Sequence, residues 1–279
     1  MAPALLQYVQ DMVFPPIFMG VSVCYFGLTL LNNPLLPLSD FHAFKEKAFA
    51  RLWLKYGPMY AEQIPEELPP LLAQCRGVVL DVGPGSGEQV KRFTHPENIT
   101  AIYGVEPGVS MHAQLREKAA QAGLAGKYHV LAATADLDAI LPQLIKAGLV
   151  SSESAKTSPA DLQLFDEIVC VRVLCGVPDQ AATAADLYAL LKPGGRLVLC
   201  EHVLNTHHWP ARLAQHLYML MGWKQLMGGC CLTRSTVDTL LKVAQARDGG
   251  WAQVNLSSAD EYTPATHVTG VLIKKGGKE

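Results

Sequence analysis

Charge is scarce in this sequence, and its basic residues do not cluster. Only 17 % of the 279 residues are charged, and 23 lysines and arginines against 25 acidic residues give a net charge of −2. A protein that binds nucleic acid needs grouped cations to neutralise phosphates, so the composition excludes a nucleic-acid partner. With 49 % hydrophobic residues, the chain can bury the core of one large domain, or of one domain with an appendage.

A cysteine framework is also missing, because the seven cysteines include no Cys-x-x-Cys pair. This absence disfavours both a zinc ribbon and a set of disulfides. Cys170, Cys175 and Cys200 lie in apolar runs, and we interpret them, with Cys230, as small buried hydrophobic residues. No acidic or cysteine partner stands at ligand spacing from a histidine. The sequence therefore predicts no metal site and a reducing compartment.

Basic residues are missing from the whole N-terminal region. No lysine or arginine precedes Lys45, and no charge of either sign lies between Met12 and Ser39. A cleaved signal peptide opens with basic residues, so none is expected. Basic residues do follow the apolar stretch, and the positive-inside rule then places the bulk of the protein in the cytosol, for example on the endoplasmic reticulum or a lipid droplet. These residues are Lys45, Lys47, Arg51 and Lys55.

Residues 13–38 are predicted to associate with a membrane surface. Pro15-Pro16 would interrupt the first helical turn, so an unbroken helix is expected only from Ile17. That helix would be roughly 22 Å long, which is short for a full span. The alternative is that the segment packs on its own domain, or on a second copy of the chain in a homodimer.

Short apolar runs alternate with amphipathic stretches through the rest of the chain, a pattern typical of a parallel sheet covered by helices on both faces. We predict an α/β, Rossmann-like doubly wound sheet of seven strands, mostly parallel with an antiparallel last strand. It would occupy residues 76–279, after an apolar helical anchor (1–38) and cap helices (39–75). The predicted strands are Gly77–Val82, Ala101–Val105, Lys127–Ala132, Phe165–Val171, Arg196–Cys200, Trp251–Leu256 and His267–Lys274.

Three glycines interrupt the chain directly after the first predicted strand, in the stretch LDVGPGSGEQV. Glycine gives up side-chain packing and conformational entropy, so its repeated use suggests that a ligand approaches the backbone closely. Amide groups that open the next predicted helix, Glu88–Phe93, would face that ligand. Glu106 ends the second predicted strand, where a carboxylate can accept both hydroxyls of a ribose. Otherwise it is a solvated strand end.

The motifs DVGPGSG, a glutamate that ends strand two, and LKPGG before strand five resemble those of class I S-adenosylmethionine-dependent methyltransferases, from about Arg76 to Lys275. The resemblance implies that S-adenosylmethionine is bound across the strand tips, with Glu106 at the ribose. Asp136 would contact the adenine, although Asp138 is close and either can be a helix cap. The residues implied around the methionine portion and the sulfonium are Asp81, Gly83, Pro84, Gly85, Ser86, Gly87, Arg172 and Val173.

Three further stretches narrow the resemblance: FDEIVCVRVLCGVPDQ, LKPGGRLVLCEHV and MGGCCLTRSTVDTLL. They are similar to the membrane-associated thiol methyltransferases of animals and to methyltransferase-like proteins of fungi. This implies methylation of a lipophilic small molecule at a thiol, hydroxyl or amine, in natural-product metabolism or detoxification. Arg172 and a longer insert at 149–162 depart from the animal pattern. A cofactor-binding enzyme that catalyses cyclisation or dehydration is the alternative, and a non-catalytic protein of this fold is a third.

His202, at the end of the fifth predicted strand, is the predicted catalytic residue. It would act as a base or hydrogen-bond the substrate; the alternative is an imidazole satisfied by the backbone. A thiol acceptor needs less help from a base than a phenol does. The substrate-side cap is expected in residues 205–235, where Leu213–Met227 would form apolar walls together with the helix Phe41–Tyr60.

Overall fold

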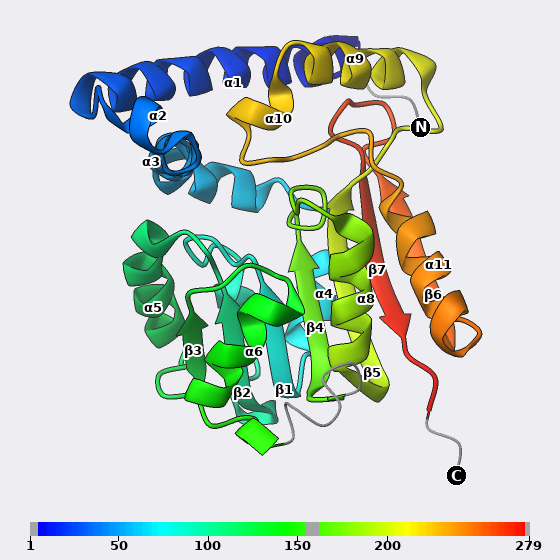
Figure 1. Cartoon of the computed structure of the whole chain (residues 1–279). Helices are drawn as coiled ribbons and strands as arrows, with labels where there is room; N and C mark the ends of the chain where they lie inside the picture. Colours follow the sequence, from blue (N-terminus) through cyan, green and yellow to red (C-terminus); the bar gives the residue numbers. More distant parts are fainter. Residues whose placement is uncertain (1–4, 154–161, 277–279) are drawn as a thin grey trace.

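A seven-stranded sheet forms the centre of the protein in the computed structural model, which describes residues 5–153 and 162–276 (Figure 1). Residues 154–161 of the predicted insert lie outside that description. The strand order is β3-β2-β1-β4-β5-β7-β6, and only β7 runs antiparallel to its neighbours. The predicted fold class is confirmed. The strands are β1 Gly77–Val82, β2 Ile99–Val105, β3 Tyr128–Leu131, β4 Phe165–Val171, β5 Leu191–His202, β6 Gln253–Ala259 and β7 His267–Ile273.

Two hydrophobic cores lie on the two faces of this sheet. Successive side chains of a strand point to opposite faces, so Leu80 of β1 belongs to one core and Val79 to the other. The Leu80 core is covered by α6 (Leu137–Lys146), α8 (Gln180–Leu190) and α11 (Thr236–Asp248). The Val79 core is covered by α4 (Leu68–Ala73) and α5 (His112–Gln121). Each face of the sheet is thus covered by an apolar core, as the continuous apolar runs of the strands predict.

The order in which strands are added to the sheet reverses at β1, because β2 and β3 lie on one side of it and β4 and β5 on the other. Ligands of doubly wound sheets bind in the crevice at the carboxyl ends of the strands at this point. The element that follows β1 differs from expectation. In place of a helix at Glu88–Phe93 there is one 3-10 turn, η1 (Val90–Arg92), so no full helix N-terminus faces the crevice. Two other 3-10 turns are η2 (Pro96–Asn98) and η3 (Val109–Met111).

Helix α1 spans Leu5–Asn32 and continues through Pro15 and Pro16, so the predicted start at Ile17 is wrong. Its 28 residues correspond to a length of about 42 Å. Proline at position 16 cannot donate to the carbonyl of Met12, four residues earlier. The Tyr218 hydroxyl of α9 donates to that carbonyl instead. A tertiary hydrogen bond therefore replaces the one that proline removes.

One face of α1 packs on the helices that lie over the strand tips (Figure 1). These helices are α3 (Phe41–Glu62), α9 (Trp209–Leu220) and α10 (Trp223–Leu226), and the short α2 (Leu36–Ser39) packs on α3. Phe18 and Met19 of α1 are buried, and the Ser22 hydroxyl donates to the Leu226 carbonyl at 2.8 Å. The Asp40 carboxylate caps α3 by accepting from the amide of Ala43, so the prediction that Ser39 or Asp40 opens this helix is confirmed for Asp40.

The other faces of α1 and α9 expose large apolar side chains, which we call the apolar outer surface. Within the described ranges, α1 is the one helix whose length and composition would suffice to cross a membrane. The members of the apolar outer surface are Leu5, Leu6, Val23, Leu28, Leu30 and Leu31 of α1 and Trp209, Leu213, Leu217 and Leu220 of α9.

Candidate active site

A cavity of about 1960 Å³ lies at the carboxyl ends of β1, β2, β4 and β5, beneath α1, α3 and α10. Small-molecule sites usually occupy about 300–1,000 Å³. The cavity therefore has room for a nucleoside-sized cofactor and a second molecule beside it. Its floor comes from the strand tips, and its roof comes from the N-terminal helices and α10.

The glycine turn after β1 is held in a left-handed conformation, with φ of +63° at Gly83 and +58° at Gly85. A Cβ at Gly83 would stand 2.5 Å from a methyl of Val173, and one at Gly85 would stand 2.9 Å from the Trp53 indole nitrogen. Both glycines, with Pro84, line the cavity. Because neither glycine has a Cβ, the side chains of Val173 and Trp53 can pack directly against the backbone of the turn. The backbone of the turn also stays accessible from the cavity.

The last two members of the turn face away from the cavity. Ser86 is fully buried, and its hydroxyl donates to the Glu88 carboxylate at 2.9 Å. A Cβ at Gly87 would meet Leu115 of α5 at 2.9 Å, so this glycine is needed for packing of the turn on a helix. Direct cofactor contact is therefore best supported for the first three residues of the predicted loop.

Glu106 lies in the cavity wall, 5 % exposed, at the tip of β2. Its two carboxylate oxygens accept from the amides of Gly85 at 2.9 Å and Gly108 at 2.7 Å. Burial raises the pKa of Glu106, and these two amides oppose that rise. The carboxylate therefore ties the glycine turn to the second strand, and its remaining lone pairs are suited to the ribose role that the sequence predicts.

Asp81 is the second buried carboxylate of the cavity, 7 % exposed at the end of β1. The Tyr128 hydroxyl donates to it at 2.7 Å. Desolvation by burial raises the pKa of Asp81 to about 6, although the hydrogen bond from Tyr128 lowers it. A bound cation would offset the cost of ionising this group, so Asp81 suits the ammonium of an amino-acid moiety.

Two predicted cofactor residues have other partners in the structure. Asp136 caps α6 by accepting from the Ala139 amide at 3.0 Å, and the cavity is lined by its neighbours Thr134 and Ala135 instead. The Arg172 guanidinium donates to the carbonyls of Tyr60 and Gln63 at the end of α3. Arg172 also lines the cavity, and its place beside the sulfonium stays a prediction. The adenine role of Asp136 stays a prediction.

His202 is the last residue of β5, where it pairs with His267 of β7, and it lines the cavity. Burial lowers the pKa of His202 to about 4, helped by the neighbouring His267, so the imidazole is neutral at physiological pH. The two rings pack with centroids 4.4 Å apart. The Arg172 guanidinium holds His267 by a hydrogen bond to its Nε2 at 3.1 Å. Arg172 thus positions His267, and the His267 ring in turn packs against His202.

The sequence interpretation missed Glu201, the fully buried neighbour of His202. Its carboxylate accepts from the backbone amides of Val173, Leu174 and Cys175 at 2.9–3.0 Å. Desolvation raises the pKa of Glu201 to about 7 against these three bonds. One side chain of β5 therefore fixes the loop after β4. The EHV motif contained this residue, but nothing local indicated that its partners lie 26–28 residues earlier.

Helix α1 forms a wall of the cavity, which the sequence interpretation also missed. Phe14, Ile17 and Phe18 line it together with Trp53 of α3 and Trp223 of α10. The predicted cap region contributes through residues Trp223 to Cys230, whereas Leu213, Leu217 and Leu220 point outward. The five side chains from α1, α3 and α10 give the cavity an apolar, aromatic wall that reaches the glycine turn at Trp53.

A family model described as a methyltransferase domain matches residues 53–248, which is well over half of the chain. The chain belongs to this methyltransferase family. The predicted resemblance to class I S-adenosylmethionine-dependent methyltransferases is thus confirmed, and family membership implies S-adenosylmethionine as cofactor. The glycine turn without Cβ atoms and the buried pair Asp81 and Glu106 fit such a cofactor.

Relatives show how far this similarity extends. Human "Thiol S-methyltransferase TMT1B" is 37 % identical over 72 residues, which is 26 % of this chain and 29 % of that protein. Yeast (Saccharomyces cerevisiae) "Methyltransferase OMS1, mitochondrial" is 29 % identical over 136 residues, 47 % of this chain and 27 % of that protein. These matches span less than a third of each relative.

A solved structure supports the fold at a larger scale. An O-methyltransferase family protein from Burkholderia thailandensis superposes with a TM-score of 0.55 and 14 % identity, covering 93 % of this chain and 73 % of that one. Identity at this level supports the architecture alone. The acceptor must be argued from the cavity.

Proposed function

We propose that the chain methylates a lipophilic small molecule, with a thiol as the preferred acceptor, at a membrane surface. The observation that carries the proposal is the continuity of one cavity from the glycine turn and Glu106 to the aromatic wall built by α1, α3 and α10. S-adenosylmethionine, when bound, supplies an activated methyl group on a sulfonium. The chain must then orient the acceptor and exclude water, and orientation alone can contribute about 7–11 kcal/mol.

The state of His202 favours an acceptor that ionises easily. With a pKa of about 4, its imidazole is a weak base at neutral pH. A thiol as acidic as the cysteine side chain, with a pKa of about 8.5, is about 30-fold more ionised at neutral pH than a phenol with a pKa of about 10. A thiol therefore depends least on a strong base. The printed name of the human relative, a thiol S-methyltransferase, agrees with this proposal.

The membrane part of the proposal rests on the position of α1. This helix has an apolar outer surface, yet Phe18, Met19, Ser22 and Thr29 are buried. A helix that crossed a bilayer would have to leave these contacts. We therefore infer that α1 lies in the interface plane with its outer face in the acyl boundary. A lipophilic acceptor would then reach the cavity past α1. That this side of the membrane is cytosolic stays a prediction.

The acceptor proposal is tested with a methyl-labelled donor and a panel of thiols with a pKa near 8.5, phenols and amines, all of matched size. We expect label on sulfur, with kcat/KM for the thiol about 30-fold above that for the phenol, following the difference in ionisation. Label on phenol oxygen at an equal rate would contradict the thiol preference. Converted but unlabelled product would instead indicate cyclisation or dehydration.

The role of His202 is tested by His202→Ala, with kinetics and S-adenosylhomocysteine binding measured side by side. We expect turnover to fall by about 10²-fold or more, the usual contribution of a positioned polar group, with cofactor affinity almost unchanged. Unaltered turnover would remove His202 from the reaction.

A further inference from the structure

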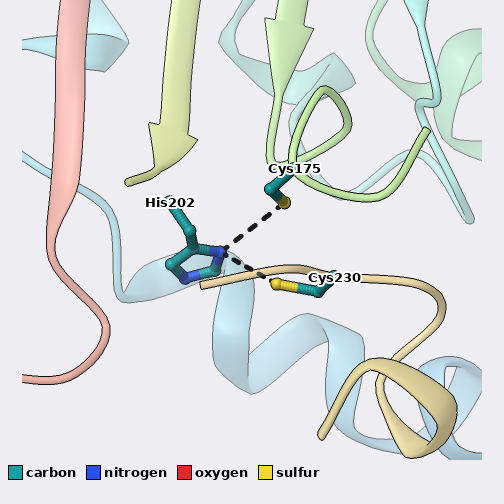
Figure 2. A group of neighbouring side chains, drawn as sticks. All are labelled: Cys175, His202 and Cys230. Atoms are coloured by element: carbon teal, nitrogen blue, oxygen red, sulfur yellow. Dashed lines mark hydrogen bonds between the residues drawn. The ribbon is translucent and has the colours of Figure 1, made fainter. Parts of the chain in front are cut away.

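Two cysteines converge on His202 at the floor of the cavity (Figure 2). The Nδ1 atom of His202 lies 3.9 Å from the sulfur of Cys175 and 3.7 Å from that of Cys230. The three potential ligand atoms all lie within 4.8 Å of one another. They come from the loop after β4, the tip of β5 and the segment after α10. Ligand spacing along the sequence could not reveal them, since the nearest two are 27 residues apart.

These distances are close to those of a tetrahedral metal site. With Zn–S bonds of about 2.3 Å and Zn–N bonds of about 2.0–2.1 Å, a sulfur and a nitrogen ligand stand about 3.5 Å apart. The observed separations of 3.7 and 3.9 Å would need to contract by only a few tenths of an ångström. Three protein ligands with an open fourth position are typical of a catalytic zinc ion.

The backbone around the cluster holds the ligands in place before any ion arrives. The Glu201 carboxylate accepts from the Cys175 amide at 3.0 Å, and Glu201 is the direct neighbour of His202. The Cys231 amide donates to the Cys175 carbonyl at 2.9 Å, which ties the Cys230 segment to the same loop. One carboxylate and one cross-loop hydrogen bond thus fix all three ligands relative to one another.

The electrostatics of the cluster favour a cation. The indole N–H of Trp223 is buried and has no hydrogen-bond partner of ordinary geometry in the described chain. A charged sulfur at Cys230 would satisfy it. Two thiolates, one neutral imidazole and a divalent cation would sum to zero charge, which suits this buried position.

We propose that Cys175, His202 and Cys230 bind one Zn²⁺ ion, whose fourth position faces the cavity and takes the sulfur of the acceptor thiol. The part about the acceptor rests on the proposed function; the metal site does not. On binding, the acceptor sulfur forms a bond to zinc and displaces a water molecule. The S–H electrons stay on sulfur, and the proton leaves to solvent. The ion would thereby hold the acceptor as a thiolate, a task that neutral His202 alone performs poorly.

The metal site is tested on the full-length protein in detergent, reduced with a phosphine and loaded with Co²⁺. We expect one ion per chain and a thiolate-to-cobalt charge-transfer band. Cys230→Ser should weaken metal affinity by more than about 100-fold, since loss of an outer partner alone costs about 10–100-fold. Cys231→Ser is the matched control, because its sulfur contacts the Thr233 hydroxyl instead. His202→Ala, which keeps both sulfurs, should weaken affinity while retaining the band.

Two results would overturn the metal site: no bound Co²⁺ or Zn²⁺ in the folded wild-type chain, or an unchanged band and affinity in Cys230→Ser. Circular dichroism identifies a variant that has failed to fold, and His202→Ala then decides the question. Adding an alkane thiol to the cobalt-loaded protein should shift the visible absorption, whereas the matched alkanol should not. A spectrum that ignores the thiol would overturn its coordination.

The activity assays distinguish this inference from the proposed function. If metal-free Cys230→Ser methylates thiols at the wild-type rate, coordination of the acceptor by zinc is dismissed and the function stands. If the metal binds as described but no acceptor receives label, the function is dismissed and the ion site stands.

Discussion

Asp81 carries a proton at mildly acidic pH that an exposed aspartate would have lost. Desolvation raises its pKa from 3.8 to about 6. The folded chain therefore binds this proton more tightly than the unfolded chain does. The resulting contribution to stability is fully present below pH 3.8 and is lost as the pH rises through about 6. Ionised Asp81 destabilises the ligand-free protein, and a cationic ligand relieves that cost.

Cofactor affinity should consequently depend on pH through Asp81. We expect the dissociation constant of S-adenosylhomocysteine to be flat above about pH 7 and to rise by up to about tenfold per unit below about pH 6, because the carboxyl must lose its proton first. Calorimetric titration across this range measures the effect. In Asp81→Asn, which keeps an acceptor for Tyr128, binding should be weak and flat. The same slope in that variant would exclude Asp81 as its source.

Gly85 should matter for a contact beyond its backbone angle. Gly85 and Gly126 have φ of +58° and +79°, so alanine at either carries a similar left-handed cost of about 1–2 kcal/mol. Only at Gly85 would the new Cβ meet the cavity side chain Trp53; nothing lies within 4 Å at Gly126. We expect Gly85→Ala to lower S-adenosylhomocysteine affinity by about tenfold or more, the equivalent of about 1.4 kcal/mol, and Gly126→Ala to leave it unchanged. Equal affinities would contradict the site assignment.

At the scale of elements, the sequence predicted best where one pattern ran without interruption. β1 and β4 begin and end at the predicted residues, since their apolar runs are bounded by glycine or polar residues. The start of helix α1 was mispredicted, because the helix-breaking tendency of proline takes account only of hydrogen bonds within the helix itself. The acceptor freed by Pro16 is met by Tyr218, about two hundred residues away, and no local pattern contains that partner.

That hydrogen bond can be measured by a double-mutant cycle. Tyr218→Phe leaves the Met12 carbonyl without its donor, and we expect a loss of about 1–3 kcal/mol in unfolding free energy. Pro16→Ala restores an amide that donates within α1. In that background Tyr218→Phe should cost markedly less, as seen in urea unfolding and in hydrogen exchange of α1. Equal costs in both backgrounds would contradict the compensation.

At the scale of the whole molecule, the sheet and its order of elements followed from alternation, whereas the cavity did not. The glycine turn and Glu106 were found because they lie beside strand ends, whose positions the fold class determines. Glu201, Cys175 and Cys230 were not found, because their contacts join segments that are distant in sequence. The wall provided by α1 was missed for the same reason.

The apolar outer surface should govern binding to lipid. Leu213→Asp with Leu220→Asp places charges on the exposed face of α9, and we expect vesicle binding to fall by about tenfold or more, given about 1.5–3 kcal/mol per fully buried leucine. Leu241→Asp, on α11 beside the sheet, is the control at an exposed leucine outside the apolar outer surface. Flotation with neutral phospholipid vesicles measures the difference. Equal loss in the control would indicate a general folding defect.

Because Phe14, Ile17 and Phe18 both belong to the N-terminal helix and border the cavity, that helix is a working part of the enzyme. Deleting this helix to obtain a more soluble protein would remove one wall of the cavity and admit water to the reacting groups. Under the proposed membrane attachment, attachment and turnover are then not separable properties, and a shortened chain would have lower activity.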